Sequence, residues 1–200
     1  MERPISPPTA HVTEQEYLRL EEKAKTKHEY RNARIVDMAG GTSEHAAIAM
    51  NLGVEIGTRL KGGPCKVFGS DLSVRIIRSG NYCYPDLMVV CGALKYAWPD
   101  RRTTIINPRV VIEVTSPSSE AGDRGEKFSD YRHLDSLEEY VLVSQERMQL
   151  ETFHRQPDGL WVIGPTVTDP GQSAKFRSLK IEIPVSDIYA GLELPLKQVV

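Results

Sequence analysis

The amino-acid sequence predicts an α/β fold, a sandwich in which helices flank a mixed β-sheet. Two short runs rich in β-branched residues, 87–91 and 110–114, are bounded by Pro or Gly and have the pattern of strands buried on both faces. Segments with the helical spacing of apolar residues precede the first run and follow the second. With 200 residues and 40% hydrophobic content, the chain can form one domain with a substantial core.

Caps and turn residues set the expected limits of the elements. Thr13 and Glu16 form a capping box at the first helix, and Ser43 is the expected N-cap of the second. Residues 1–12 are expected to be an irregular arm and 13–200 a single domain. Pro99-Asp100 is followed by two arginines rather than an apolar run, so a loop is expected there. In chain order, the expected elements are a helix at 13–24, a hairpin at 29–38, a helix at 43–60, strands at 66–68, 72–77, 87–91 and 110–114, a helix from 122, a strand at 140–143, a hairpin at 148–163, and a short strand and turn at 176–192.

Cysteine usage and hydropathy predict a cytoplasmic protein. The three cysteines, Cys65, Cys83 and Cys91, are odd in number and lack paired spacing, which favours reduced thiols. No apolar stretch reaches the length of a membrane span and no signal peptide opens the chain, so no membrane partner is expected.

Two acidic residues stand where buried strands are predicted. Glu113 lies between Ile112 and Val114, and a carboxylate in an apolar layer needs a cation or a hydrogen-bonding partner, because unpaired burial of its charge is costly. Asp86 stands at the entrance of the other strand, where Pro85 restricts the backbone. If the strands are neighbours, both carboxylates can bind one metal ion. The alternative is that Glu113 forms a structural ion pair and Asp86 is a turn residue.

Lys127 is the cation expected near this pair. Asp123, Lys127 and Tyr131 have helical spacing, so they line one face of a helix that Gly122 and Asp123 would start. The turn at 116–119 would fold this helix back over the end of the Glu113 strand, where the ammonium could orient an attacking water or screen charge. The alternative is a surface ion pair between Asp123 and Lys127, worth about 0.5 kcal/mol and without catalytic function.

A third acid is available at the start of the helix at 43–60. Glu44 lies in the first turn, where a carboxylate also interacts favourably with the helix dipole, so a metal-binding role and a structural role are both open. His45 is expected to be a surface residue or to support the ligands rather than to be one. Asp71 could approach Asp86, although it is expected to face solvent or cap a turn.

Other catalytic patterns are missing from the sequence. The five histidines lack the spacing of zinc ligands, and the chain contains no Gly-x-Ser-x-Gly nucleophile motif. The glycines at 122 and 125 do not form a phosphate-binding loop, because the segment is too short and no Ser or Thr follows Lys127 directly. Oxygen ligands alone favour Mg²⁺ or Mn²⁺.

Four segments in order resemble the PD-(D/E)XK nuclease superfamily, and within it the Uma-type family of restriction-endonuclease-like proteins. They are Tyr-Pro-Asp-Leu-Met-Val-Val from 84, Val-Ile-Glu-Val-Thr-Ser-Pro-Ser-Ser from 111, Asp-Arg-Gly-Glu-Lys-Phe-Ser-Asp-Tyr from 123 and Glu-Tyr-Val-Leu-Val from 139. The superfamily name places a Lys two residues after the acid, where this chain has Thr115; in the Uma-type branch the Lys lies on the following helix, and Lys127 matches it.

The resemblance implies a restriction-endonuclease-like sandwich with an extra N-terminal helix and β-hairpins. It also implies a Mg²⁺- or Mn²⁺-dependent endonuclease acting on DNA. Asp86, Glu113 and Lys127 would be the catalytic residues, with Asp86, Glu113 and Glu44 at the metal. Superfamily members often dimerise to cut both strands, so a homodimer is expected.

The charge of the chain leaves a second function class open. A net charge of −2 and a pI near 6.2 lack the basic footprint of most nucleic-acid binders, and no stripe of aromatic and basic residues for stacking single-stranded bases runs along the sequence. The alternative to a nuclease is therefore a non-catalytic binding or assembly module that keeps the fold.

Overall fold

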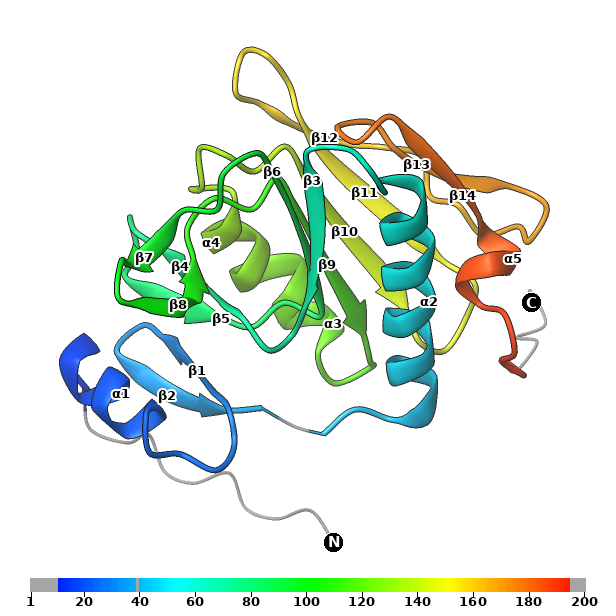
Figure 1. Ribbon diagram of the computed structural model, residues 1–200. Coiled ribbons are helices and arrows are strands. Elements are labelled where there is room, and N and C mark those ends of the chain that lie inside the picture. Colours follow the sequence, from blue (N-terminus) through cyan, green and yellow to red (C-terminus); the bar gives the residue numbers. More distant parts are fainter. Residues whose placement is uncertain (1–10, 39, 195–200) are drawn as a thin grey trace, which may run out of the picture.

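The computed structural model describes residues 11–38 and 40–194, so most of the expected arm at 1–12 lies outside the described residues. Its centre is a mixed sheet with the strand order β12-β11-β10-β9-β6-β3 (Figure 1). Strands β9 and β10 are parallel, and the other neighbours in this sheet are antiparallel. Its strands are β3 (Cys65–Gly69), β6 (Leu87–Cys91), β9 (Val110–Thr115), β10 (Glu139–Ser144), β11 (Leu150–Arg155) and β12 (Trp161–Ile163).

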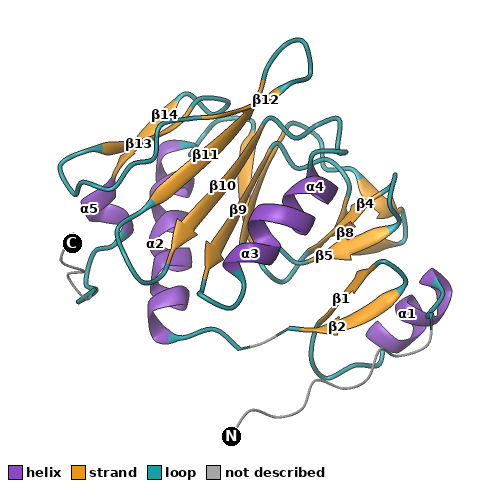
Figure 2. Cartoon of the chain, turned by 180° about the vertical axis from the view of Figure 1, so that it is seen from behind, coloured by secondary structure: helices purple, strands orange, loops and turns teal. Residues whose placement is uncertain are grey.

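Helices cover both faces of this sheet, which confirms the predicted sandwich. Helix α2 (Ser43–Arg59) lies on one face, where Ile48, Leu52 and Ile56 are buried against it. The other face is covered by α3 (Glu120–Gly122), the π-helical turn η1 (Asp123–Lys127) and α4 (Phe128–Tyr131), as Figure 2 shows. The strands are buried on both faces, as their uninterrupted apolar runs predict.

A second sheet, in the order β2-β1-β5-β4-β8-β7, lies beside the first. Helix α1 (Glu14–Glu21) packs on it through the buried rings of Tyr17, Tyr30 and Tyr82, and the predicted capping box of Thr13 and Glu16 is present. Its strands are β1 (His28–Arg31), β2 (Arg34–Asp37), β4 (Ser73–Ile76), β5 (Asn81–Cys83), β7 (Tyr96–Trp98) and β8 (Arg101–Ile105). The chain ends in β13 (Ser173–Phe176), β14 (Ile181–Pro184) and α5 (Val185–Ile188), which pack on the α2 side.

The structure corrects several local expectations. Pro99 and Asp100 lie in the expected loop, a turn between β7 and β8, but β8 itself was not expected; its backbone pairs with β4 and β7 although its first three side chains are exposed and polar. The N-cap of α2 is Thr42 rather than Ser43; the Thr42 hydroxyl accepts a hydrogen bond from the amide of His45. The helix that carries Lys127 begins at Glu120, before the predicted start.

The expectation of three reduced cysteines is wrong for two of them. Cys65 and Cys91 form a disulfide, because the antiparallel pairing of β3 and β6 places them opposite each other. Cys83 is buried and free. The cytoplasmic location, which rested partly on reduced thiols, stays a prediction. Among the described residues, no helix is long and apolar enough to cross a membrane.

Candidate active site

Strands β6 and β9 bring Asp86 and Glu113 together, and the expectation that these strands are neighbours is confirmed. Leu87 pairs with Ile112 in antiparallel register, so Asp86, one residue earlier, lies opposite Glu113 at the end of the ladder. The Asp86 carboxylate accepts a hydrogen bond of 2.7 Å from the backbone amide of Val114, which fixes it beside β9. Residues opposite each other in an antiparallel pair share a face of the sheet, so the two acids border one site.

Glu113 is a buried carboxylate, with a relative exposure of only 3%. Val111, on the same side of β9, packs in the core beneath α4, whereas Ile112 and Val114 pack on the α2 side. Burial raises the pKa of Glu113 well above its usual range, and the nearby charge of Lys127 opposes this rise only in part. A cation beside this carboxyl group would favour its charged form.

Lys127 is surrounded by acids. Its Nζ atom lies 3.4 Å from the Glu113 carboxylate, 3.2 Å from that of Asp123 and 3.3 Å from that of Glu29. Burial acts to lower the pKa of Lys127, but these three carboxylates outweigh it and raise the pKa well above its usual value. The Asp123–Lys127 pair exists, but it is not a surface ion pair, because the exposed fractions of the two side chains are only 6% and 15%.

The π-helical turn η1 positions Lys127. The amide of Phe128 donates to the carbonyl of Asp123, five residues earlier, which is the hydrogen bond of a π-turn. The Tyr140 hydroxyl, buried in the core, donates to the same carbonyl at 2.9 Å. Such single π-turns occur frequently at functional sites, because they change the direction of side chains within a helix.

Glu29 is a site residue that the sequence did not reveal. It lies on β1, where it is 5% exposed, and its carboxylate accepts a hydrogen bond of 3.2 Å from the backbone amide of Tyr84. Arg31 on the same strand lies 3.8 Å from it. The short polar sequence around Glu29 does not distinguish it from a surface acid. Glu29 becomes buried when β1 pairs with β5, a strand far away in the sequence.

The start of α2 reaches the site through His45. The Nε2 atom of His45 lies 3.2 Å from the Asp86 carboxylate, and this hydrogen bond raises the pKa of the imidazole despite its partial burial. Glu44 is engaged with its own amide and with Thr42 and Ser43, which lower its pKa. Asp71 faces solvent and pairs with Lys27 at 2.6 Å, as expected for a residue outside the site.

The donor set fits a hard divalent cation with few protein ligands. In the part of the chain that the structure describes, no three His, Cys, Asp or Glu side chains are arranged to hold a metal together. Asp86 and Glu113 nevertheless supply two neighbouring carboxylates, and Mg²⁺ is commonly held by one or two carboxylates, with water and substrate phosphates completing its shell. The site also contains more acidic than basic side chains. The acids are Asp86, Glu113, Asp123 and Glu29, and the basic residues are Lys127 and Arg31.

A family model described as "Uma2: Putative restriction endonuclease" matches residues 14–186 of this chain. The chain belongs to the Uma2 family. Two proteins of Synechocystis sp. are also similar and are described only as uncharacterized. The protein slr1290 is 36% identical over 94% of this chain and 96% of its own length. The protein sll1609 is 32% identical over 76% of this chain and 85% of its own length.

The fold of this Uma2 protein also occurs in a solved structure. A crystal structure titled as a putative nuclease belonging to DUF820 from Anabaena variabilis aligns with a TM-score of 0.71 at 16% identity, covering 89% of this chain and 97% of the other. This likeness confirms the restriction-endonuclease-like fold class.

Proposed function

We propose that this Uma2 protein is a metal-dependent endonuclease that hydrolyses phosphodiester bonds in DNA. The observation that carries the proposal is the placement of Asp86 opposite Glu113 at the end of two buried strands, with the Lys127 ammonium 3.4 Å from Glu113. The description of the family as "Putative restriction endonuclease" supports the same reaction class. The acidic pI does not oppose it, because the site carries several of the acids that a cation would neutralise.

Asp86 and Glu113 are the proposed ligands of Mg²⁺ or Mn²⁺. Such an ion, when bound, would stabilise the charge that develops on the phosphate oxygens and lower the pKa of a water molecule. Glu44 is proposed as a third ligand from α2, on the resemblance to the nuclease superfamily; it would have to leave its contacts with Thr42 and Ser43 to reach the metal. His45 holds Asp86 from the side of α2, while the Val114 amide holds it from β9.

Lys127 is the proposed partner of the attacking water. Its ammonium favours the charged form of Glu113, and it is held in place by Asp123 and Glu29, so its direction is set before DNA binds. Hydrolysis adds the water oxygen to phosphorus as the bond to the leaving oxygen breaks; the attacking water gives up a proton to solvent, and the leaving oxygen takes one up from solvent. Lys127 would then orient the water and offset the negative charge of the transition state.

The direct test is cleavage of DNA by the purified protein. Single-stranded, double-stranded and branched DNA would be incubated with Mn²⁺ and, in parallel, with EDTA. The proposal expects metal-dependent internal cuts in at least one substrate. If all three stay intact with Mn²⁺ at concentrations of protein that bind DNA, the nuclease assignment is wrong.

One observation favours the alternative of a non-catalytic module. Lys127 by itself provides the cation that the buried Glu113 requires, so the charge of Glu113 is explained without a metal. In that case DNA would be bound but not cut, and the acids would serve only stability.

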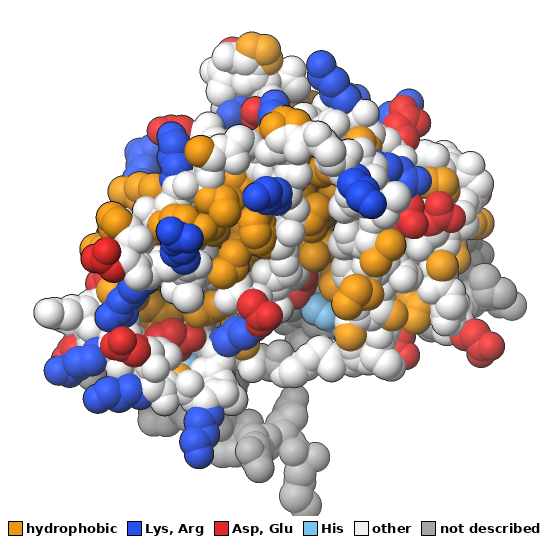
Figure 3. All heavy atoms as spheres, in the orientation of Figure 1, with side chains coloured by type: hydrophobic (Ala, Val, Ile, Leu, Met, Phe, Trp, Pro, Cys, Tyr) orange, Lys and Arg blue, Asp and Glu red, His pale blue; other side chains and the backbone are white. Residues whose placement is uncertain are grey.

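We further propose that the protein is a two-fold homodimer, with the second hairpin in the interface. Leu160, Val162 and Ile163 at β12 are exposed by 66%, 48% and 60%, and β12 is the edge of the central sheet. Apolar side chains stand on the projecting tip of this hairpin in Figure 3. Light scattering should give twice the 22.4 kDa of one chain at micromolar concentration, and Val162→Lys should give the monomer. A wild-type protein of 22.4 kDa under these conditions would refute the dimer.

A further inference from the structure

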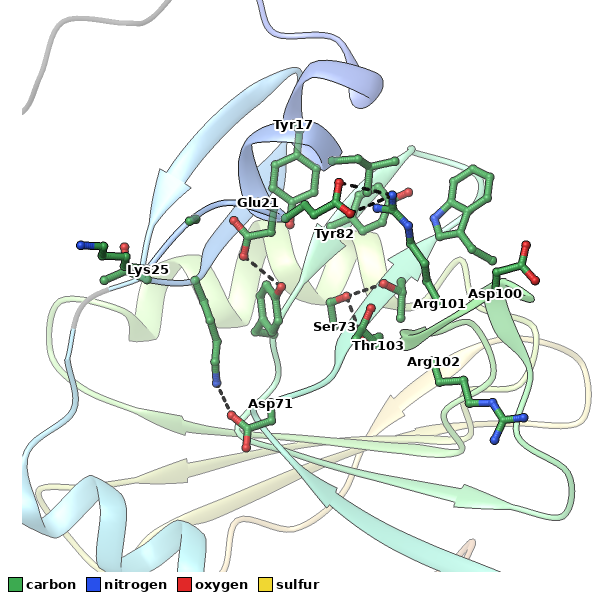
Figure 4. Close-up of a pocket in the computed structure, with 18 residues that line it drawn as sticks. Tyr17, Glu21, Lys25, Asp71, Ser73, Tyr82, Asp100, Arg101, Arg102 and Thr103 are labelled. Carbon is green, nitrogen blue, oxygen red and sulfur yellow. Dashed lines mark hydrogen bonds and ion pairs between the residues drawn. The ribbon is translucent and has the colours of Figure 1, made fainter.

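A cavity of 580 Å³ lies between α1 and the second sheet, next to the candidate active site. In Figure 4, Tyr17 and Glu21 of α1 stand on one side of it, and Ser73 and Thr103 of the neighbouring strands stand on the other. Its volume is in the range of pockets that bind small molecules, so it can take a single nucleotide but not a duplex. No residue of this cavity has a role in the proposed cleavage.

The wall of the cavity is aromatic, and its rim carries both basic and acidic side chains. Tyr84 and Trp98 line it and are partly exposed, and Trp98 pairs with Arg101 on the neighbouring strand. Arg75 lies over the Trp98 ring at 5.2 Å. Flat aromatic rings beside guanidinium groups are the usual surface on which unpaired bases stack. The sequence does not show this arrangement, because it is assembled from three separate segments.

The cations of the rim are available to a phosphate group. Arg101 is only loosely paired with Glu22, at 3.4 Å between two half-exposed side chains. Lys27 pairs with Asp71, whose side chain is almost fully exposed, and also donates to the carbonyl of Ser70 at 2.9 Å. Arg102, also on the rim, makes no ion pair within the described residues. Exposed ion pairs contribute little stability, so a phosphate can replace the acids at small cost.

The cavity and the active site share one piece of chain. Tyr84, which lines the cavity, donates its backbone amide to Glu29, the residue 3.3 Å from the Lys127 ammonium. Only Pro85 separates Tyr84 from Asp86. A DNA strand with one base in the cavity would therefore continue past Tyr84 toward the two catalytic acids.

We propose that this cavity binds an unpaired nucleobase of the DNA substrate, so the enzyme acts where a strand is single or distorted. This inference rests on the proposed nuclease function and names its substrate class. The base would stack on Trp98, and the phosphates beside it would contact Arg101 and Lys27. The polar side chains of Ser73 and Thr103 would face the edge of the base.

Trp98 provides a direct probe, because the chain contains only one other tryptophan, Trp161. In the Trp161→Phe variant, the fluorescence of Trp98 would be followed as DNA is added in EDTA, so that no strand is cut. The probes are a blunt duplex, the same duplex with a four-nucleotide single-stranded tail at either end, and thymidine monophosphate. We expect tailed DNA to quench Trp98 and blunt duplex to leave it unchanged.

Affinity for the same fluorescein-labelled DNA would be measured in a matched pair of variants. Trp98→Ala should weaken binding of tailed DNA by about tenfold or more, while Trp98→Phe, which keeps a ring, should stay within about threefold. Circular dichroism would show that both variants are folded, and the Trp98 signal of the Trp161→Phe protein tests the proposal even if Trp98→Ala does not fold.

Three results would overturn the proposal. The first is no change in the Trp98 signal although tailed DNA binds. The second is equal quenching by blunt and tailed DNA. The third is quenching by thymidine monophosphate, at equal concentration, that is as strong as quenching by DNA. None of these results affects the nuclease assignment, because cleavage with Mn²⁺ is scored separately in the wild-type protein.

Discussion

Asp86→Asn should lower metal-dependent DNA cleavage by about 10³-fold or more. The substitution removes one of the two carboxylate charges proposed to hold the metal, and metal stabilisation of a phosphoryl transition state is worth several kcal/mol, with each 1.36 kcal/mol equal to tenfold in rate. The asparagine oxygen can still accept the hydrogen bond from the Val114 amide, so the strand end should keep its structure. Initial rates of cleavage in Mn²⁺ measure the effect.

Asp37→Asn is the matched control for this variant. The Asp37 side chain on β2 is 94% exposed and lies 3.8 Å from the imidazole of His28, so its loss should leave the rate unchanged. If Asp86→Asn retained more than about a tenth of the wild-type rate while remaining folded, the metal chemistry would not depend on Asp86.

Lys127→Met should lower the free energy of unfolding by about 3–5 kcal/mol, because removal of one partner leaves buried charges uncompensated. Methionine keeps the length of the side chain but leaves the carboxylates of Glu113, Asp123 and Glu29 without their shared cation. Urea denaturation at pH 7 would measure the difference. A surface ion pair would instead contribute about 0.5 kcal/mol.

Lys175→Met provides the comparison, because Lys175 pairs with Glu182 at 3.3 Å, a distance close to that of the Lys127 pairs. The Lys175 side chain is 66% exposed, so its substitution should cost less than about 1 kcal/mol. Equal losses of stability in the two variants would contradict the buried role of Lys127.

The direction of the pKa shifts gives the pH dependence of this effect. The raised pKa of Lys127 means that its contribution to stability is present at every pH below about 10.4, the value of a free lysine, and is lost only as pH rises through the folded value. The raised pKa of Glu113 means that stability falls as pH rises from about 4.3 through the folded value. The loss of unfolding free energy in Lys127→Met should therefore become smaller as the solution is acidified toward pH 5, because protonation of Glu113 removes one of the uncompensated charges.

The central sheet could be predicted from the sequence because its signals are local. The runs at 87–91 and 110–114 are apolar on both faces, and the antiparallel pairing of these strands brings Asp86 and Glu113 together as expected. The second sheet was harder to predict, because β8 begins with three exposed polar side chains and only its last two residues, Thr104 and Ile105, are buried.

The rest of the site depends on contacts between distant segments. Glu29 approaches Lys127 only because β1 joins the second sheet beside Tyr84, a relation that no short motif encodes. The disulfide was missed for the same reason, since Cys65 and Cys91 are 26 residues apart and meet through strand register. His45 was expected to be a surface residue or to support the ligands, and its contact with Asp86 agrees with the second role.

Calorimetric titration of Mn²⁺ tests the shared metal site most directly. Wild-type protein should bind Mn²⁺, and the affinity should be higher at pH 8 than at pH 6, because the raised pKa of Glu113 makes metal binding compete with a proton. Glu113→Gln should weaken binding by at least about 100-fold, since even residues behind the ligands cost 10–100-fold when changed. Glu182→Gln, at an exposed glutamate on β14, should bind as the wild type does. Equal affinity for Mn²⁺ in the wild type and in folded Glu113→Gln would contradict the account.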